Sequence, residues 1–157
     1  YRFKVSGRTK HFINVFGEEV IIENADQAIN AACEQTDALV KDYTACPIFM
    51  EVGNQGGHEW LIEFSKPPVD LGKFSVALDN ALKAINSDYE AKRSSDLTLN
   101  FPVVHQAEKG RFDEWLKKKG KLGGQHKVPR LSNTRAIFDE IITLHTNGMK
   151  LEKRSSV

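Results

Sequence analysis

A hairpin signal at the centre of the chain restricts the fold more than any other feature of the sequence. Residues 45–52 are apolar and extended in character, residues 58–65 repeat that character, and residues 54–57 between them read Asn-Gln-Gly-Gly. Two apolar runs joined by asparagine and glycine indicate paired antiparallel strands. The sequence Lys-Pro-Pro at residues 66–68 ends the second run, because proline cannot donate to a strand ladder. Any fold for this chain therefore contains antiparallel sheet.

Further strands are predicted on both sides of the hairpin. Residues 1–6 alternate aromatic or apolar side chains with polar ones, and this period of two indicates a half-buried strand. Residues 12–16 resume extended structure, and residues 20–22 form a short apolar stretch. Residues 97–105 are a further strand candidate.

Two helices are predicted around the hairpin by the spacing of apolar residues. The first covers about 25–40, with Asn24 as its N-cap and Gln27 as the capping-box partner. The second begins after Asp70, and residues 86–96 are interpreted as its polar end and an exposed connector. Its apolar stripe consists of Leu71, Phe74, Leu78, Leu82 and Ile85.

Two more helices are predicted in the last third of the chain. Gly110 opens a short helix, and residues 117–125 form a loop rich in lysine and glycine. Ser132 or Asn133 caps a last helix. The apolar residues of these helices are Phe112, Trp115 and Leu116 in one and Ile137, Phe138, Ile141, Ile142 and Leu144 in the other.

The order of these elements defines the fold class. Hairpins interleaved with helices indicate an α+β fold, a mostly antiparallel β-sheet flanked by helices. With 157 residues, 40% of them hydrophobic and 27% charged, the chain suits one domain with a sizeable core. We expect a single domain over residues 1–149 and a flexible tail at residues 150–157. Because the chain starts within a strand pattern and without methionine, we expect it to be a domain of a longer protein.

Composition and motif searches exclude several functions. No apolar run reaches the roughly 18 residues of a membrane helix, and two cysteines are too few for a disulfide framework or a four-ligand zinc site. The five histidines show no metal-ligand spacing. Nucleophile-elbow, phosphate-loop and His-Glu-x-x-His motifs are absent from the sequence. We therefore expect no metal site, no membrane partner and a cytoplasmic protein with reduced thiols.

Positive charge is concentrated in residues 109–130. Eight Lys or Arg residues stand there against two acidic residues, a net charge of +6, whereas the whole chain sums to +1. Such a stretch can bind nucleic acid, hold the phosphates of a nucleotide, or form a solvated lysine-rich surface. Aromatic residues do not interleave with the lysines, so we expect no nucleic-acid partner. The other two interpretations stay open on composition.

Residues 7–20 form a second unusual stretch. Two glycines flank a turn between extended pieces, and Arg8 and Lys10 place two cations in it. The stretch is either a tight hairpin with exposed charges or a hinge or ligand loop, where glycine permits changes of backbone angle.

The stretch resembles the hinge motif of adenylate-forming enzymes, which joins a large N-terminal domain to a small C-terminal one. Asn14 departs from the motif, in which lysine is usual at that place. The positions that fit the motif are Gly7, Arg8, Lys10, Ile13, Gly17 and Val20.

The rest of the chain resembles one branch of that superfamily, the C-terminal domain of the auxin-responsive acyl-acid amido synthetase family in its bacterial form. Residues 125–130 read Gln-His-Lys-Val-Pro-Arg, close to that family's Gln-aromatic-Lys-x-Pro-Arg. Residues 102–104 and 110–112 match its strand followed by Gly-x-Phe. The resemblance covers about residues 1–145.

This resemblance implies an ATP-dependent ligase. In such an enzyme a carboxylic acid and ATP give an acyl-adenylate with the help of Mg²⁺, and an amine or amino acid then takes the acyl group. A larger N-terminal adenylation domain of the same polypeptide would hold the acid and the nucleotide, while this chain would be a mobile lid. Alone, the chain would bind no cofactor and have no activity. The alternative is a non-catalytic module whose basic 109–130 face holds an anionic ligand or a protein.

The resemblance also implies roles for individual residues. Arg8, Lys10 and Gly17 match the hinge, and Lys127 is the candidate catalytic residue, a cation that meets the adenylate phosphate or the pyrophosphate. Other superfamily members carry a catalytic lysine in Pro-x-x-x-x-Gly-Lys, where this chain has Arg135 instead. That role therefore falls to Lys127, to Arg135 or to neither. The candidate phosphate-binding residues are Arg130 and Arg135.

Overall fold

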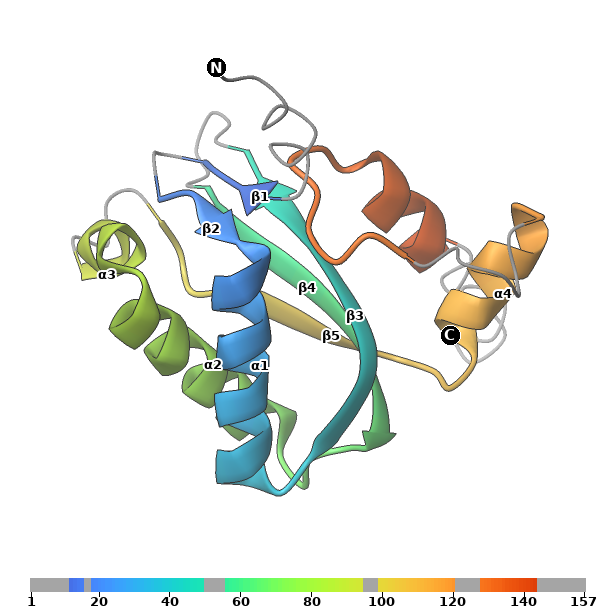
Figure 1. Cartoon of the computed structure of the whole chain (residues 1–157), viewed down its shortest axis with the longest axis horizontal. Coiled ribbons are helices and arrows are strands. Elements are labelled where there is room, and N and C mark those ends of the chain that lie inside the picture. Colours follow the sequence, from blue (N-terminus) through green and yellow to red (C-terminus); the bar gives the residue numbers. More distant parts are fainter. Residues whose placement is uncertain (1–11, 16–17, 50–55, 95–98, 121–127, 144–157) are drawn as a thin grey trace, which may run out of the picture.

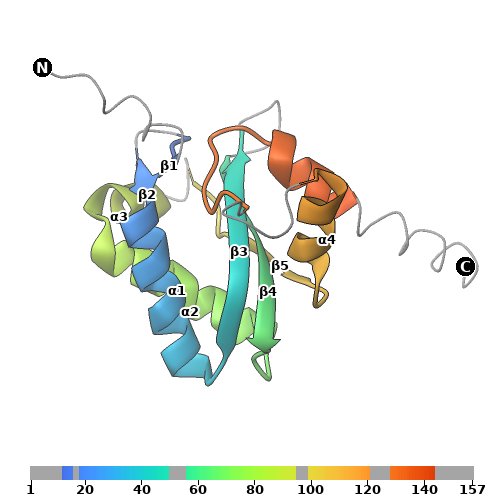
Figure 2. The same cartoon turned by 45° about the vertical axis from the view of Figure 1, so that its right-hand side comes forward.

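A computed structural model describes residues 12–15, 18–49, 56–94, 99–120 and 128–143 of the chain. Its centre is a three-stranded sheet with helices on both faces. Figures 1 and 2 show α1 (Ile22–Thr36), α2 (Leu71–Ile85) and α3 (Ser87–Ser94) on one side of this sheet. On the other side lie α4 (Arg111–Lys118) and a further helix over residues 136–143.

The predicted hairpin forms the core of the sheet, although its first strand spans Leu39–Ile48 and not the predicted residues 45–52. β3 (Leu39–Ile48) pairs antiparallel with β4 (Gly57–Lys66), in a register that sets Cys46 opposite Glu59. β5 (Val103–Ala107) pairs with the other edge of β4 in the parallel direction, because α2 and α3 carry the chain back across the sheet. A separate antiparallel pair joins β1 (Phe12–Ile13) to β2 (Val20–Ile21). The predicted α+β class, with antiparallel pairing predominant, is confirmed.

One face of the sheet packs on α1 and α2. The predicted cap of α2 is confirmed, since the Asp70 carboxylate accepts hydrogen bonds from the amides of Gly72 (2.9 Å) and Lys73 (3.4 Å). Alanines on the inner side of α1 are buried and let the two helices approach closely. The largest side chains of this core are Tyr43, Trp60, Ile62, Phe64, Phe74, Leu78 and Leu82.

The predicted bounds of α1 are wrong at both ends. The helix begins at Ile22, so Asn24 stands in its first turn, where its side-chain oxygen accepts a hydrogen bond from the amide of Ile21 (3.2 Å). It ends at Thr36, because Asp37 turns the chain with a φ of 56°. The residues after that turn, Leu39 and Val40, belong to β3 and pair with β4. Strand pairing thus overrides the helical spacing that the sequence shows at this point.

Two other predicted elements differ from the structure. Within residues 86–96, expected to be a helix end and connector, lies α3, whose Tyr89 is buried and donates to the Asp79 carboxylate at 2.6 Å. Arg93 of α3 reaches the same carboxylate with two contacts of 2.9 Å, and this pairing docks a mostly polar helix. β5 begins at Val103, later than predicted, and ends at Ala107.

The second face of the sheet carries a smaller core. The predicted short helix is confirmed as α4, which Gly110 opens with a φ of 86°. Glu63 of β4 is fully buried and accepts the amides of Gly110 (2.8 Å) and Phe112 (3.4 Å), so a sheet residue satisfies the first amides of this helix. This core contains Cys46, Leu61, Ala107, Phe112, Trp115, Leu116, Val128, Phe138 and Ile141.

The last helix starts later than Ser132 or Asn133 would allow as caps. Residues 136–143 are helical, and the Asn133 side chain accepts a hydrogen bond from the distant Asn14 amide instead. No helix in the described ranges is long and apolar enough to cross a membrane.

Candidate functional site

The candidate site is built around residues 128–135, called the motif segment here because its first residues complete the Gln-x-Lys-x-Pro-Arg pattern. This segment lies along the edge of β3. The amide of Ala45 donates to the carbonyl of Arg130 at 2.9 Å, and the amide of Ser132 donates to the carbonyl of Ala45 at 3.1 Å. Backbone pairing therefore fixes the position of the segment on the sheet.

The residue types of the motif segment suit this edge position. Pro129 has no amide to donate, and its carbonyl accepts the hydroxyl of Thr44 at 2.7 Å. Val128 and Leu131 are both buried, the first in the core beside α4 and the second in the core beside α1 and α2. Anchors in both cores hold the segment, and Lys127 immediately precedes the first anchor in the sequence.

Four of the predicted site residues lie outside the described residues. They are Arg8, Lys10, Gly17 and Lys127, and their proposed roles stay predictions. The structure describes the other two candidates, Arg130 and Arg135.

Arg130 is half-exposed and faces α1. Its guanidinium lies 3.2 Å and 3.4 Å from the two carboxylate oxygens of Asp26 and 5.8 Å from the centre of the Tyr43 ring. The Tyr43 hydroxyl donates to the same carboxylate at 2.6 Å, and burial, with this carboxylate, raises the pKa of Tyr43 well above its ordinary value. Arg130 thus lines a hollow of about 380 Å³ between α1 and β3, with one of its nitrogens already paired.

Arg135 is held by a cluster on the second face of the sheet. Its guanidinium donates to Glu59 at 2.8 Å, to Asp139 at 3.1 Å and to the carbonyl of Pro47 at 3.0 Å. Glu59 also lies 2.6 Å from Nε2 of His105. This network ties the end of the motif segment to β3, β4 and β5.

The charge states within this cluster follow from its contacts. Burial alone would raise the pKa of Glu59, but hydrogen bonds from His105 and Arg135 hold it below its ordinary value. Burial likewise opposes the charge of Arg135, yet its bond to Glu59 leaves the pKa raised. Cys46 lies 3.4 Å from Arg135, and burial raises the pKa of its thiol to about 12. Arg135 is therefore a charged structural anchor here, and it would have to leave Glu59 to bind a phosphate with the same nitrogen.

One residue of the 7–20 stretch contacts the motif segment at this site. The amide of Asn14, in the stretch that resembles a hinge, donates to the side-chain oxygen of Asn133 at 2.9 Å. Sequence reasoning assigned Asn133 only a capping role and did not connect it with the hinge. Neither residue type nor spacing could reveal the contact, because 119 positions separate the two residues.

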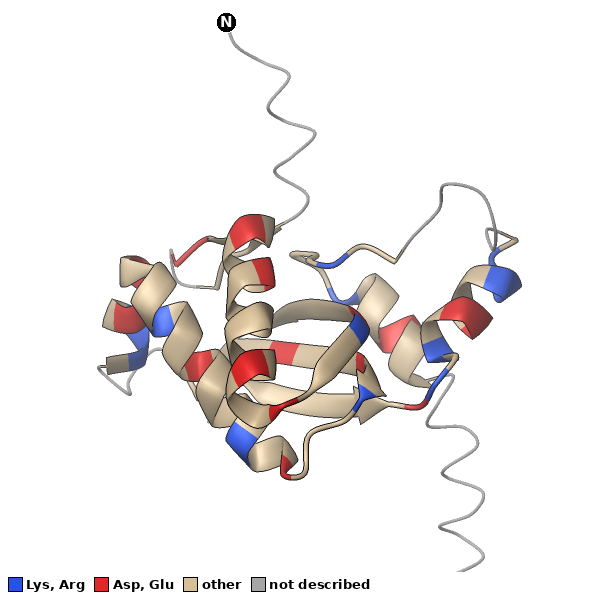
Figure 3. Cartoon of the chain, turned by 60° about the horizontal axis from the view of Figure 1, so that its bottom comes forward, with Lys and Arg blue, Asp and Glu red and all other residues tan. Residues whose placement is uncertain are grey.

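Acidic neighbours partly neutralise the basic stretch at residues 109–130 (Figure 3). Arg111 pairs with two glutamates, Lys119 pairs with Glu140 and Arg130 pairs with Asp26. Three of the six basic residues that the structure describes there are thus in ion pairs. These residues therefore do not form a broad, uniformly positive face.

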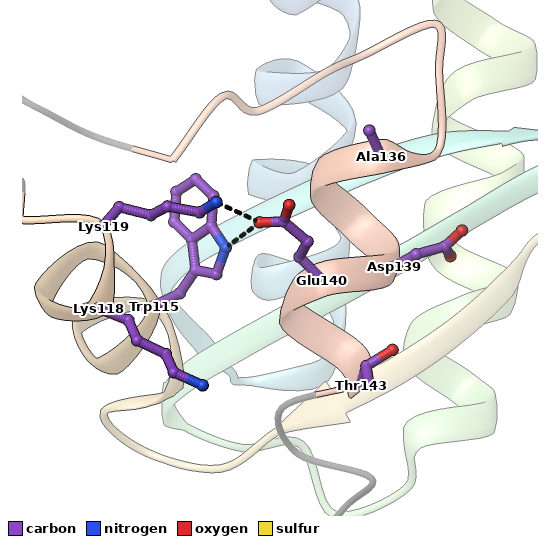
Figure 4. A pocket seen from close by; sticks show the side chains of 7 residues that line it. All are labelled: Trp115, Lys118, Lys119, Ala136, Asp139, Glu140 and Thr143. Atoms are coloured by element: carbon purple, nitrogen blue, oxygen red, sulfur yellow. Dashed lines mark hydrogen bonds and ion pairs between the residues drawn. The ribbon is translucent and has the colours of Figure 1, made fainter.

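A groove of about 550 Å³ lies between α4 and residues 136–143. Figure 4 shows the side chains of Lys119 and Trp115 converging on Glu140 from the opposite wall. The ammonium and the indole N–H each lie 3.0 Å from one oxygen of this carboxylate, and the Lys119 contact lowers the pKa of Glu140. The groove therefore already holds an anion of its own beside that cation.

Metal ligands do not cluster in the part of the chain that the structure describes. No group of three or more His, Cys, Asp or Glu side chains is arranged there to hold a metal ion.

Comparison with known proteins finds one family model and two solved structures to which the chain is similar. The model of the family described as "GH3 family C-terminal domain" matches residues 23–136. No curated protein matches the chain closely enough in sequence to count as a relative. Among solved structures, the AtGH3.15 acyl acid amido synthetase in complex with 2,4-DB is similar at a TM-score of 0.66 and 16% identity over 85% of this chain. A second structure, of GH3.15 acyl acid amido synthetase, is similar at 0.65 and 16% over 83%. The chain spans 25% of each of those chains.

Proposed function

The chain belongs to the GH3 family, as its C-terminal domain, and from that premise we propose that it is the small, mobile domain of an ATP-dependent acyl-acid amido synthetase. The proposal extends to a larger N-terminal adenylation domain on the same polypeptide, since the chain spans only a quarter of the similar solved chains. The N-terminal domain, a cytoplasmic location and a bacterial origin are all parts of this proposal.

The proposed reaction has two steps. In the first, a carboxylate oxygen of the acid attacks the α-phosphorus of ATP, and the bond to pyrophosphate breaks. In the second, the nitrogen of an amine or amino acid attacks the acyl carbon, the bond to AMP breaks, and the amine releases a proton. Activation is needed because a free carboxylate is a poor acyl donor, whereas AMP is a good leaving group. ATP is a substrate here, and Mg²⁺ remains an expectation for the complete enzyme.

The observation that carries the proposal is the contact between the two motif-bearing stretches. Asn14 of the hinge-like stretch and Asn133 of the motif segment are joined by a hydrogen bond, and β3 holds the motif segment by its backbone. A rigid link of this kind would let a rotation about the hinge carry the end of the motif segment with it. This arrangement supports a domain that delivers a side chain to a site on another domain.

Lys127 is the side chain proposed for delivery. It immediately precedes Val128, which is buried, and its cation would stabilise the negative charge that develops on the adenylate phosphate or on pyrophosphate. Arg135 is a weaker candidate for this role, because Glu59, Asp139 and Pro47 already occupy its guanidinium. Arg130 remains a candidate for a supporting phosphate contact.

The test uses the complete protein, with its upstream domain. Acid-dependent ATP–pyrophosphate exchange is measured with a panel of carboxylic acids for the wild type and for Lys127→Ala. We expect the rate to fall by about a hundredfold or more in the variant, as when a charge-stabilising group is removed from an active site. Normal exchange with failed amide formation would move Lys127 to the second step. Normal rates of both steps would contradict its catalytic role.

A matched control separates this proposal from the binding-module alternative. Lys118→Ala removes an exposed cation nine positions earlier in the same basic stretch. The ligase proposal predicts an unchanged exchange rate for this variant. The alternative, in which the basic 109–130 face holds an anion or a protein, predicts that Lys118 and Lys127 matter to similar degrees. The ion pairs of Arg111, Lys119 and Arg130 already weaken that alternative.

A further inference from the structure

A buried contact between an imidazole and a carboxyl group joins the hinge-like stretch to the sheet. Nε2 of His58, in β4, lies 2.8 Å from a carboxylate oxygen of Glu18, and each side chain is about 1% exposed or less. Glu18 belongs to the stretch that resembles the hinge of adenylate-forming enzymes. The pair spans 40 positions of sequence, and none of the proposed chemistry uses it.

The Glu18 carboxylate also shapes the turn between β1 and β2. The same oxygen that faces His58 accepts the backbone amide of Val15 at 2.7 Å. The side-chain amide of Asn86, at the end of α2, donates to the carbonyls of Glu18 (2.9 Å) and Glu19 (3.2 Å). Contacts from β4 and from α2 thus hold this turn in one orientation.

The arrangement is costly in free energy. Glu19 has a φ of 37°, in the left-handed region that a residue other than glycine seldom adopts. Nδ1 of His58 is buried without a hydrogen-bond partner among the described residues. Burying polar groups away from water costs free energy unless hydrogen bonds compensate for the lost water. The contacts that Glu18 makes with His58 and with the Val15 amide give the turn one defined orientation.

The turn is also coupled to the motif segment. Val15, whose amide Glu18 holds, follows Asn14, whose amide donates to Asn133. One chain of contacts therefore runs from His58 through Glu18 and the turn to the motif segment that follows Lys127.

From this chain of contacts we propose that His58 and Glu18 are positioning residues, which fix the hinge-like stretch to the sheet that carries the motif segment and so set the orientation of this sheet about the hinge in each half-reaction. The inference rests on the proposed function. We assign His58 no contact with substrate, and it acts only through Glu18. Its loss should therefore alter the balance between adenylation and amide formation, and a loss of folded protein cannot produce that effect.

The experiment uses the complete enzyme with Glu18→Gln and His58→Gln, which keep hydrogen-bonding side chains but remove the contact between imidazole and carboxyl group. Asp79→Asn is the matched control, because it removes another buried carboxylate, one that binds Tyr89 and Arg93 between α2 and α3. ATP–pyrophosphate exchange and amide formation are measured for each variant, together with hydrogen exchange of peptides that cover residues 12–20 and 72–82.

We expect both hinge variants to change the ratio of amide formation to pyrophosphate exchange by about tenfold, the equivalent of one hydrogen bond. Hydrogen exchange should accelerate in residues 12–20 and stay unchanged in residues 72–82. Asp79→Asn should lower the thermal midpoint and leave the ratio unchanged. An unchanged ratio in both hinge variants, or unchanged protection of residues 12–20, would overturn the inference.

Failure of the proposed function and failure of the positioning role give different results. If the wild-type enzyme shows no acid-dependent exchange, the proposed function is contradicted. The positioning role of His58 and Glu18 in catalysis, which depends on that function, is then contradicted as well. A wild type that exchanges normally, with hinge variants that lose both half-reactions in equal proportion, contradicts only the positioning role.

Discussion

The backbone amide of Asn14 donates a hydrogen bond of 2.9 Å to the side chain of Asn133, which lies 119 positions further along the chain. This contact joins a stretch that resembles a hinge to a segment that completes the family motif. Because β3 pairs with the motif segment and His58 of β4 contacts Glu18 close to Asn14, both Asn14 and Asn133 belong to the body of the domain.

Asn133→Ala should destabilise the chain by about 1 kcal/mol, because the part-buried Asn14 amide loses its acceptor. Asn133→Asp keeps an oxygen in place and should recover most of that loss. Urea denaturation of the wild type and both variants measures the difference. Equal stability of Asn133→Ala and wild type would contradict a contribution from this bond.

Asp79 should make the stability of the chain depend on pH in the acid range. Burial raises the pKa of its carboxyl, but hydrogen bonds from Arg93 and Tyr89 outweigh that effect and leave it below the ordinary value. A lowered folded-state pKa means that the stabilisation is complete above the unfolded value of about 3.9 and is lost as pH falls through the folded value.

Denaturation midpoints measured from about pH 6 down to pH 2 check this prediction. Wild type should lose stability on acidification more steeply than Asp79→Asn, whose amide does not titrate. Parallel curves for the two proteins would contradict the stated role of Asp79.

Cys46 should resist thiol reagents in the folded chain. Its pKa of about 12, raised by burial from 9.0, implies roughly a thousandfold less thiolate than an ordinary cysteine has at neutral pH. Labelling of Cys33→Ser, in which Cys46 is the remaining cysteine, should be slow until denaturant is added. Rapid labelling under native conditions would show that the thiol is accessible.

Gly110→Ala should destabilise the chain by about 1–2 kcal/mol through backbone strain, because the glycine has a φ of 86°. An added Cβ would meet no atom within 4 Å, so steric clash contributes nothing. Gly110→Asn should cost less, since asparagine tolerates this region better. Thermal denaturation compares the stabilities of the two variants. A lower midpoint for Gly110→Asn than for Gly110→Ala would contradict the explanation by backbone strain.

The parts of the fold that could be predicted are those with strong local signals. The hairpin carried its own turn residues, and α2 carried both a cap at Asp70 and a complete apolar stripe. The bounds of α1 could not be predicted, because Leu39 and Val40 fit a helix locally but pair with β4 in the fold. α3 was not predicted, because the helix is held by tertiary contacts from Arg93 and Tyr89 to Asp79 of α2.

The motif of the candidate site could be predicted from the sequence, but the residues that hold the site in place could not. The pattern at residues 125–130 identified the family, and the family model confirms that identification. Arg135, by contrast, was expected at a phosphate, whereas the structure pairs it with Glu59 from β4, a partner that no spacing rule connects with it. The pairing of Glu18 with His58 depends in the same way on which strands the fold brings together.

We propose that this chain acts as the C-terminal domain of an amide-forming enzyme, and a measurement of amide formation tests this proposal most directly. The complete protein and the 157-residue chain are each incubated with ATP, Mg²⁺, a panel of carboxylic acids and amino acids, and the amide and AMP are quantified. The account predicts equal amounts of amide and AMP from the complete protein and neither product from the chain alone. Turnover by the chain alone, or a complete protein that forms neither acyl-adenylate nor amide with any acid, would contradict it.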